Sequence, residues 1–400
     1  MSILNRKKVL LAITAGIAAY KATFLVRLFI KQGADVKVIL TPEALDFITP
    51  LTLSTLSKNP VHWQFTDEAE NWNNHVDLGL WADFMVFAPT TANTLSKMAD
   101  GASDNLVLAT YLSAKCPIYI APAMDLDMYL HPTTKANLDK LKSFGNHIIP
   151  AESGELASGL SGEGRMAEPE NIIAFLESHL LRSAPLYGKK ILVSAGPTYE
   201  KIDPVRFIGN FSSGKMGIEI AKAALGMGAD VTLVCGPSSI STENYSINRI
   251  NVVSAEEMKK AMDDAYESAD VVIMSAAVAD YRPLNKAEQK IKKSDENLHI
   301  ELVKNPDILK GLGERKTHQI LVGFALETTN EIAFAKEKLE KKNLDLIVLN
   351  SLQDSEAGFQ KDTNKVSIIS EKAEIVHYKA KNKSEVAKDI LNFILENYDI

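Results

Sequence analysis

Three polar segments in the first half of the chain have residue types that suit a phosphorylated ligand. Segment 14–21, TAGIAAYK, combines a glycine with a threonine, so a phosphate could rest on a helix N-terminus and on the Thr14 hydroxyl. Segments 88–94 (APTTANT) and 122–129 (PAMDLDMY) each follow a short apolar run. Such segments lie where parallel α/β sheets bind ligands, at the carboxyl ends of strands. Taken alone, segment 14–21 is equally typical of an ordinary strand–helix turn.

The second half contains a longer segment with similar chemistry. Residues 194–217 read SAGPTYEKIDPVRFIGNFSSGKMG, and the SSGK at 212–215 stands where a helix is expected to begin. Hydroxyl groups, free backbone N–H groups and a lysine together favour phosphate binding. The spacing does not match GxxxxGK[ST], so no P-loop is indicated.

Charged residues follow farther along the second half. Asp280, in SAAVADY (275–281), is a candidate for contact with a nucleotide or a metal ion. A lysine-rich loop comes next and is usually only solvated, but here it lies between segments that follow strands and can supply charge to a polyphosphate. Its lysines are Lys286, Lys290, Lys292 and Lys293.

Two lysines near residue 340 have a similar interpretation. Lys338 and Lys342 are four residues apart on a predicted helix, a like-charge spacing that costs the helix a little free energy. An anion bound between them would remove that cost. The alternative is an ordinary charged helix face. KNPDI (304–308) and GFALET (323–328) lie between these lysines and the earlier loop.

An internal echo shows how these segments are positioned. KKVLLAITAG (7–16) resembles KKILVSAGP (189–197), and GADVKVILTP (33–42) resembles GADVTLVCGP (228–237). Each half thus opens with a strand, a helix and a second strand. The apolar N-terminal run is therefore predicted to be a strand and not a signal peptide.

The fold class is predicted to be α/β, with two Rossmann-like domains, each a mostly parallel sheet flanked by helices. Short strands that are apolar along their whole length suit parallel sheets buried on both faces. Ser254 and Glu257 form a capping-box pattern before a helix, and apolar i,i+4 pairs indicate a helix over 24–31. Pro and Gly near 183–188 place the boundary there, giving domains 1–188 and 189–400. The expected strands are 9–13, 36–40, 84–87, 118–121, 191–194, 231–234, 250–253, 271–274, 320–323 and 346–349.

Composition excludes several classes of protein. The 400 residues carry a net charge of -7, so no whole-chain basic footprint for nucleic acid exists. No apolar run reaches the length of a membrane helix. The two cysteines, Cys116 and Cys235, match neither a disulfide framework nor a zinc site, which favours a reducing, cytoplasmic location.

Five motifs together resemble the flavin-dependent cysteine decarboxylases. They are GIAAYK, His75 in NHVDLGLWAD, PTTANT, PAMDLDMY and the GRM at 164–166. With IGNFSSGKMG (208–217), the resemblance extends over nearly the whole chain to the bifunctional phosphopantothenoylcysteine decarboxylase/phosphopantothenate–cysteine ligases. It implies a flavodoxin-like flavoprotein domain followed by a ligase domain.

For the first half, the resemblance implies FMN-dependent decarboxylation of 4′-phosphopantothenoylcysteine to 4′-phosphopantetheine. His75 matches the active histidine, whose neutral imidazole can accept a proton near neutral pH; a lone histidine is otherwise usually a surface or core residue. The implied FMN-binding residues are Thr14, Gly16, Ile17, Thr41, Pro89, Thr90, Thr91, Asn93 and Met124.

Two candidate catalytic positions depart from the family pattern. Asp125 stands where the family has an asparagine that binds the substrate carboxylate, and an ionised Asp125 would repel that group. Ser158, in the glycine-rich loop 153–166, stands where related enzymes have a cysteine that protonates the intermediate. A hydroxyl is a far weaker acid than a thiol. These departures leave open a flavin domain that has lost or rebuilt its protonation step.

For the second half, the resemblance implies ligation of cysteine to 4′-phosphopantothenate through an acyl-cytidylate, with CTP and Mg2+. Asn210 would hold the acyl-nucleotide, Lys290 is also expected to be catalytic, and Asp280 is the candidate metal contact. The implied substrate- and nucleotide-binding residues are Ser212, Ser213, Gly214, Lys215, Met274, Ser275, Ala276, Asp280, Lys292, Asn305, Pro306, Asp307, Ile308, Phe324, Lys338 and Lys342.

The expected partners are small molecules and further copies of the chain. The substrates are 4′-phosphopantothenate, cysteine and CTP, with no nucleic acid and no membrane. The resemblance implies a homo-oligomer with flavin-domain trimers and ligase-domain dimers, up to a dodecamer. One alternative is an active ligase whose flavin domain is impaired and serves as an assembly scaffold. Another, a dinucleotide oxidoreductase, requires a GxGxxG motif that neither half has.

Overall fold

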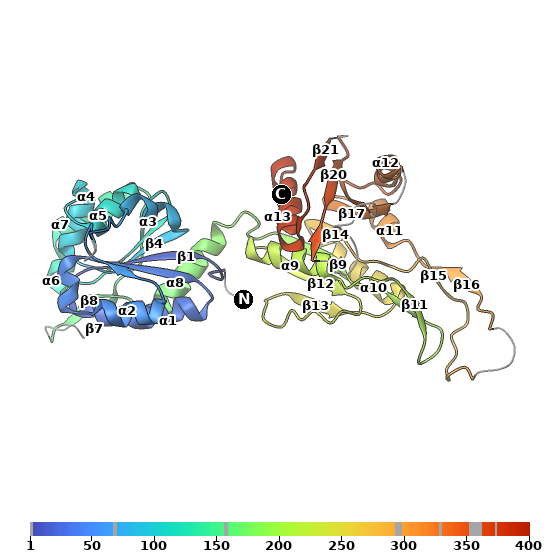
Figure 1. Ribbon diagram of the computed structural model, residues 1–400, viewed down its shortest axis with the longest axis horizontal. Coiled ribbons are helices and arrows are strands. Elements are labelled where there is room, and N and C mark those ends of the chain that lie inside the picture. The colour runs from blue at the N-terminus through green and yellow to red at the C-terminus, as the bar shows by residue number, and fades with distance from the viewer. Residues whose placement is uncertain are drawn as a thin grey trace. The chain divides into compact units, whose positions relative to one another are not determined.

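The computed structural model describes residues 3–66, 70–155, 159–292, 298–327, 330–351, 362–372 and 374–400. The chain divides into two compact units, Met1–Leu180 and Leu181–Ile400 (Figure 1). The sequence places the boundary slightly later, and the domain limits 1–188 and 189–400 stay a prediction. Ser158 and Lys293 lie outside the described residues. None of the helices in the described residues has both the length and the apolar character that a membrane span requires.

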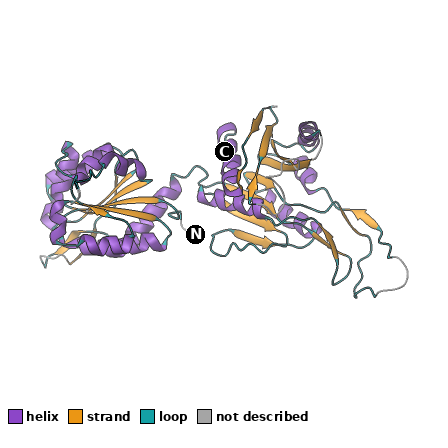
Figure 2. Cartoon of the chain, in the orientation of Figure 1, coloured by secondary structure: helices purple, strands orange, loops and turns teal. Residues whose placement is uncertain are grey.

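The first unit is built on a parallel sheet with the strand order β3-β2-β1-β4-β5-β6. Its four central strands, β2, β1, β4 and β5, are largely apolar and buried because helices cover both faces (Figure 2). One face packs against α1, α2 and α8, and the other against α3, α4, α5 and α7. The strands are β1 (Lys8–Ile13), β2 (Asp35–Leu40), β3 (Val61–His62), β4 (Phe84–Thr90), β5 (Ile118–Pro122) and β6 (His147–Ile148).

The helices of this unit begin at recognisable caps. Thr91 and Asn105 accept hydrogen bonds from backbone N–H groups at the start of α4 and α5. The helices are α1 (Lys21–Lys31), α2 (Pro50–Ser57), α3 (His75–Trp81), α4 (Ala92–Asp100), α5 (Leu106–Ser113), α6 (Leu126–Leu130), α7 (Pro132–Ser143) and α8 (Pro169–Arg182), with 3-10 turns η1 (Ile17–Tyr20) and η2 (Pro42–Asp46). An antiparallel hairpin, β7 (Glu152–Glu155) and β8 (Ser161–Arg165), precedes α8.

The second unit has a larger sheet, ordered β13-β12-β9-β14-β17-β18-β20-β21. It is parallel from β13 to β18, and β20 and β21 are antiparallel. Helices α9 and α13 pack on one face, and α10, α11 and α12 on the other. The strands are β9 (Lys190–Ala195), β12 (Asp230–Cys235), β13 (Asn248–Asn251), β14 (Val271–Met274), β17 (Ile320–Glu327), β18 (Leu346–Ser351), β20 (Val366–Ser370) and β21 (Ile375–His377).

Three short antiparallel ribbons extend this unit, and two of them matter for the candidate site. The first pairs β10 (Tyr199–Lys201) with β11 (Phe207–Gly209), and the second pairs β15 (Tyr281–Pro283) with β16 (Leu302–Lys304). The third ribbon pairs β19 (Thr363–Asn364) with β22 (Lys381–Asn382). The helices are α9 (Lys215–Gly226), α10 (Ala255–Tyr266), α11 (Ile308–Glu314), α12 (Glu331–Lys341) and α13 (Lys383–Asn397).

The predicted fold class, two mostly parallel sheets flanked by helices, is confirmed. The internal echo has a structural counterpart, because Lys8 pairs with Asp35 in one sheet and Lys190 with Asp230 in the other. The capping box at Ser254 is present. The helix expected from 24 begins earlier, at Lys21, and Phe24 is 54% exposed, so its i,i+4 pairing is not a core contact.

Candidate active sites

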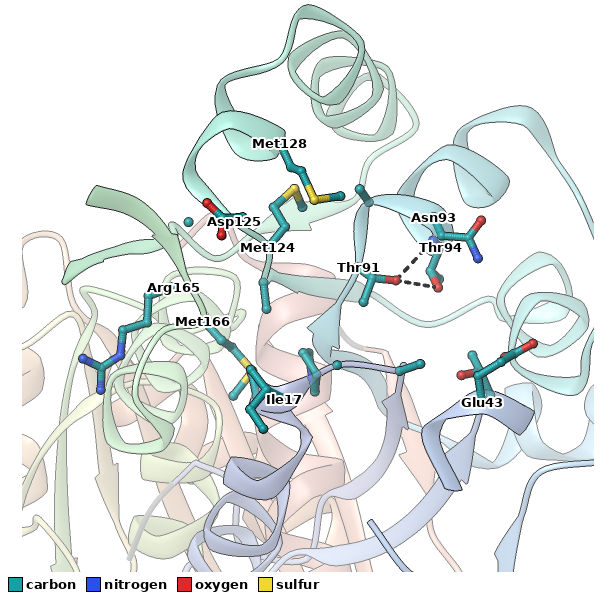
Figure 3. Close-up of a pocket in the computed structure, with 18 of the residues that line it drawn as sticks. Ile17, Glu43, Thr91, Asn93, Thr94, Met124, Asp125, Met128, Arg165 and Met166 are labelled. Atoms are coloured by element: carbon teal, nitrogen blue, oxygen red, sulfur yellow. Dashed lines mark hydrogen bonds between the residues drawn. The ribbon is translucent and has the colours of Figure 1, made fainter. Parts of the chain in front are cut away.

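A cavity of about 770 Å³ lies at the carboxyl ends of the first unit's strands. Figure 3 shows Met124, Asp125 and Met128 on one side of it and Ile17 on another. The segments that line it follow β1, β2, β4 and β5, together with part of the β7–β8 hairpin. Its lining comprises Ala15, Gly16, Ile17, Ala18, Tyr20, Lys21, Thr41, Glu43, Pro89, Thr91, Ala92, Asn93, Thr94, Lys97, Asn105, Ala123, Met124, Asp125, Met128, Glu155, Gly164, Arg165 and Met166.

Hydrogen bonds join two of these segments beneath the cavity. The buried Thr14 hydroxyl donates to the Pro89 carbonyl at 3.0 Å and accepts from the Thr91 N–H at 3.0 Å. Thr91 in turn caps α4. Thr90 is buried, and its hydroxyl donates to the Phe87 carbonyl at 3.2 Å. Thr14 and Thr90 therefore support the cavity wall from behind and are not among its lining residues.

Thr41, a lining residue of the cavity, has an unsatisfied polar group. It is 4% exposed, and its hydroxyl oxygen has no hydrogen-bond partner among the described residues. A buried hydroxyl without a partner costs free energy, which a ligand that bonds to it would recover. The cavity wall thus contains a buried hydroxyl whose hydrogen bond is unmet among the described residues.

Asp125 lies at the junction of the cavity wall and α6. Its Oδ1 accepts the Leu126 N–H at 2.7 Å. Its neighbour Met124 is fixed against the β7–β8 hairpin, because the Met124 N–H donates to the Gly164 carbonyl at 3.0 Å. Gly164 has φ 143°, and a Cβ there would lie 2.6 Å from the Met124 carbonyl oxygen. Only glycine lets the two segments approach this closely.

A part-buried ion pair joins the cavity wall to Glu168, the residue before α8. Lys21 is 4% exposed and donates to the Met166 carbonyl and to Glu168 Oε1, each at 3.0 Å. Arg165 also pairs with Glu168. Burial alone would raise the pKa of Glu168, but the two cations outweigh it and hold that pKa below its usual value. The network fixes the end of β8 beside η1.

His75 lies outside this cavity lining. It is the first residue of α3, and its ring contacts Phe65 and Trp72 edge-on, with centroids 6.2 and 5.9 Å away. Its Nδ1 is buried and has no hydrogen-bond partner among the described residues.

The cavity brings together eight of the predicted residues and adds others that sequence reasoning missed. The eight are Gly16, Ile17, Thr41, Pro89, Thr91, Asn93, Met124 and Asp125. Lys21 is the last residue of the motif GIAAYK, but nothing in the sequence marked it as a cavity residue. Its partners, Met166 and Glu168, are far away in the sequence. Asn105 could have been found as a capping residue before an apolar run. Glu43, Lys97 and Arg165 carry no local pattern that marks them.

In the second unit, the start of α9 packs very closely against the sheet. A Cβ at Gly217 would lie 2.7 Å from Ser275 Oγ and from the Ala195 Cβ. The hydroxyls of Ser212 and Ser213 accept the N–H groups of Gly214 and Lys215, at 3.3 and 3.5 Å. Lys215 pairs with Asp362. The predicted phosphate segment is thus brought beside the residues that follow β14, which include Ser275 and Ala276.

Asn210 and Asn305 converge on the same segment. Asn210 Nδ2 donates to the carbonyls of Ala277 and Val278, at 3.2 Å each. Asn305 Nδ2 donates to the Ala279 carbonyl, and its N–H donates to the Asp280 carbonyl, both at 2.8 Å. The three motifs around Asn210, Asp280 and Asn305 therefore meet beyond the carboxyl end of β14.

The predicted lysines Lys338 on α12 and Lys342, which caps the end of that helix, lie beside the start of α11. Lys342 Nζ lies 2.9 Å from Asp307 Oδ2, and Lys338 Nζ donates to the Phe324 carbonyl at 2.7 Å. Asp307 caps α11. Burial would raise the pKa of Asp307, but Lys342 and, more weakly, Lys338 hold it below its usual value. A shallow groove of about 320 Å³ runs over Phe334, Glu337, Lys338, Lys341 and Lys342.

Other predicted residues of this site are exposed. Asp280, Lys290 and Lys292 are exposed, and the two lysines form no ion pair with the residues that the structure describes. Within those residues, no group of three or more His, Cys, Asp or Glu side chains could hold a metal ion.

Two further predicted residues are buried. Met274 is buried at the end of β14, and Ile308 is buried at the start of α11. Pro306 precedes Asp307 in the same turn.

Comparison with known proteins assigns each unit to a protein family. Residues 2–181 match the family model described as Flavoprotein, and residues 186–398 match the DNA/pantothenate metabolism flavoprotein C-terminal domain. A cysteine/cysteine sulfinic acid decarboxylase from an unknown prokaryotic organism is 54% identical over 354 residues, covering 87% of this chain and 99% of that protein.

Two further relatives match almost end to end. The coenzyme A biosynthesis bifunctional protein CoaBC of Bacillus subtilis (strain 168) is 43% identical and covers 98% of this chain and 97% of its own. The protein of the same name from Haemophilus influenzae is 43% identical and covers 99% and 98%. The chain therefore belongs to the family of coenzyme A biosynthesis bifunctional proteins, with a flavoprotein unit followed by a DNA/pantothenate metabolism flavoprotein C-terminal domain.

Proposed function

We propose that the first unit binds FMN and decarboxylates 4′-phosphopantothenoylcysteine to 4′-phosphopantetheine. The observation that carries the proposal is the cavity of about 770 Å³ at the strand ends of a unit that matches the flavoprotein family. Its size is typical of sites that enclose a cofactor. When bound, the flavin supplies the redox chemistry at the cysteine side chain that makes the carboxylate a leaving group.

The residues of the cavity fit such a cofactor. The Thr41 hydroxyl, which has no partner among the described residues, lies in the cavity wall beside the ligand. Gly16 lets the ligand approach the backbone closely, and the first turn of α4, at Ala92 and Asn93, offers N–H groups to a phosphate. Met124 and Met128 exclude water from an apolar wall.

We infer that a second copy of the chain completes the first site. His75, the expected proton acceptor, is outside the cavity lining, and the Trp72 ring beside it is 60% exposed. Leu80 on α3 and Leu112 on α5 are also exposed apolar side chains of this unit, at 57% and 51%. Self-association that covers these side chains would bring His75 of one copy toward the cavity of another. Light scattering should therefore show a homo-oligomer, of which the trimer is the expected form for this unit.

The second unit, on the same proposal, ligates cysteine to 4′-phosphopantothenate using CTP. A carboxylate oxygen attacks the α-phosphorus, the bond to pyrophosphate breaks, and the cysteine amine then displaces CMP from the acyl carbonyl. The start of α9 receives a phosphate group, and Asn210 orients the acyl-nucleotide. Lys290, Lys292, Lys338 and Lys342 supply positive charge to the polyphosphate. Mg2+ bound to the nucleotide would neutralise further charge, with Asp280 as its protein contact.

The two half-reactions can be assayed separately on the full chain. Anaerobic incubation with 4′-phosphopantothenoylcysteine should release CO2 and give 4′-phosphopantetheine by mass spectrometry. CTP, 4′-phosphopantothenate and cysteine should release pyrophosphate and form the amide. Lys290→Gln should stop amide formation and leave decarboxylation unchanged. Absence of CO2 from protein that retains its flavin would contradict the first assignment, and full ligase turnover in Lys290→Gln would contradict the second.

A second candidate substrate for the first unit is free cysteine or its sulfinic acid. It is favoured by the 54% identical relative of that name and by the charge of Asp125 in the cavity wall. Two unit charges 4 Å apart interact by about 4 kcal/mol at an effective dielectric constant of 20. An ionised Asp125 repels a carboxylate by that order and attracts the ammonium group of a free amino acid equally.

The effect of Asp125→Asn on kcat/KM for each of the two substrates decides between these candidates. If free cysteine is the preferred substrate, Asp125→Asn should lower kcat/KM for cysteine and raise it for 4′-phosphopantothenoylcysteine. Asp127→Asn, a neighbouring exposed carboxylate outside the cavity lining, is the matched control. No CO2 from cysteine with either protein excludes the second candidate.

A further inference from the structure

The turn between β10 and β11 holds the lysine-rich loop mainly at Ile291. Asp203 is 1% exposed, and both of its oxygens are in use. Oδ1 accepts the N–H groups of Val205 and Arg206, at 2.8 Å each. Oδ2 accepts the guanidinium of Arg206 and the N–H of Ile291, the latter at 3.1 Å.

Arg206 completes the contact from the other side of the same peptide segment. Its Nη2 donates to the Ile291 carbonyl at 3.0 Å while the guanidinium stays paired with Asp203. Ile291 is thus held by its N–H and by its C=O. A further bond joins the same two segments, from the Ala287 N–H to the Ile202 carbonyl at 3.0 Å.

Ile291 lies directly between Lys290 and Lys292. Neither lysine forms an ion pair with the described residues, and both are exposed, so the backbone bonds at Ile291 are what locate their Cα atoms. The turn that makes these bonds leads through β11 to Asn210. One short hairpin therefore sets the lysine pair and Asn210 relative to each other, and Figure 1 shows β11 and the β15–β16 ribbon at the same end of the unit.

We propose that Asp203 and Arg206 are positioning residues for the ligase reaction, which hold Lys290 and Lys292 ready to receive the triphosphate of the nucleotide. The inference rests on the nucleotide role proposed above for these lysines. Two flexible lysines on an unrestrained loop would lose conformational freedom on binding, and the clamp at Ile291 removes part of that cost in advance. Carboxylate and guanidinium suit the task because the planar fork can engage both a carboxylate and a carbonyl.

The electrostatics of the turn are consistent with a permanent ion pair. The hydrogen bonds from Arg206, against an opposing effect of burial, hold the pKa of Asp203 far below its usual range, with further support from the N–H groups of Val205, Arg206 and Ile291. The clamp is therefore charged at any pH at which the enzyme would work. Its strength comes from geometry that an amide cannot reproduce, because one of the two accepting oxygens would become an NH2 group.

The test uses the full chain and two independent readouts. Hydrogen–deuterium exchange followed by mass spectrometry measures the protection of the Ile291 amide, and pyrophosphate release measures KM and kcat for CTP. Asp203→Asn should accelerate exchange at Ile291 and raise the KM for CTP by about tenfold, with a smaller change in kcat, because binding must then order the loop. Asp264→Asn, which breaks an exposed ion pair with Lys260 on α10, is the matched control.

Arg206→Lys provides a second test in case Asp203→Asn fails to fold. It keeps the charge but loses the fork that reaches the Ile291 carbonyl, so it should show a smaller rise in the same KM. The double variant should be no worse than Asp203→Asn alone, since both act through one contact. Unchanged protection at Ile291 in Asp203→Asn, or a loosened loop with KM within twofold of the parent, overturns the proposal. Lys290→Gln tests the lysine assignment independently of Asp203. Full ligase turnover in this variant refutes that assignment, whatever the result for Asp203→Asn.

Discussion

The two candidate sites both lie at the carboxyl ends of parallel strands. They differ in how far their residues enclose a ligand. The first is a partly enclosed cavity of about 770 Å³, lined by backbone turns and by the buried Lys21. The second is spread over exposed side chains and a shallow groove on α12 of about 320 Å³. Enclosure suits a group that stays bound, whereas an open, charged surface suits a nucleotide that must leave in every cycle.

The difference also lies in what each site still lacks. In the first, the Thr41 hydroxyl in the cavity wall is buried and has no partner among the described residues. In the second, Asn210 already donates to two carbonyls and Lys342 is paired with Asp307, whereas Lys290 and Lys292 form no ion pair with the described residues. A ligand that binds at Asn210 or Lys342 must exchange bonds rather than add them. We therefore expect substitutions in the second site to act mainly through the arrangement of its segments.

The largest expected effect is the loss of one activity without the other. Asn210→Ala removes the amide that joins β11 to the segment after β14, and should lower ligase kcat/KM by about 100-fold or more, the order seen when an oriented donor is deleted. Decarboxylation by the first unit should not change. Asn248→Ala, which removes an amide bonded to Thr232 on β12, is the control. Equal losses in both activities would show that the two sites are coupled.

A smaller effect is expected from adding one methyl group to each unit's first turn. Gly217→Ala places a Cβ 2.7 Å from Ser275 Oγ, so α9 must shift and the second unit should lose about 1–3 kcal/mol of stability. Gly16→Ala meets only Thr91 Cγ2, at 3.6 Å, and should change the first unit's stability by under about 0.5 kcal/mol while weakening flavin retention.

Tryptophan fluorescence distinguishes a loss of stability in the first unit from a loss of stability in the second. All three tryptophans, Trp63, Trp72 and Trp81, belong to the first unit, so their emission reports that unit alone. Calorimetry reports both units. A Gly217→Ala protein whose calorimetric transitions match those of the parent would show that the approach of α9 to β14 is looser than described.

The sequence predicted the scaffold of each site better than its contacts. Apolar strands and the internal echo were enough for two parallel sheets, because burial on both faces leaves a strong signal. The antiparallel strands β20 and β21 were missed because they continue no βαβ pattern. Lys21, Arg165 and Glu168 could not be joined from sequence, since their pairing depends on a hairpin folding over η1. Asp203 gave no signal because its partner Ile291 is apolar and its contact is with the backbone.

The smallest expected effect is a pH dependence confined to the first unit. His147 on β6 and His179 on α8 have ring centroids 4.0 Å apart, and the Tyr119 hydroxyl lies 2.9 Å from His179 Nδ1. Burial, and then the proximity of His179, lower the pKa of His147, while burial raises that of Tyr119 to about 12. The unfolded chain therefore binds a proton at His147 more readily than the folded chain does. Stability from this histidine is fully present above its unfolded pKa of about 6.5 and is lost as the pH falls below it.

This loss should appear as a lower midpoint of the tryptophan-detected thermal transition at pH 5.5 than at pH 7.5. His147→Gln keeps a polar side chain but cannot titrate, so it should reduce that difference. His377→Gln, at an exposed histidine of the second unit, is the matched control and should leave the tryptophan signal unaltered. If His147→Gln retains the full pH dependence, the acid sensitivity of the first unit comes from its carboxylates, with the Lys21–Glu168 pair the first place to test.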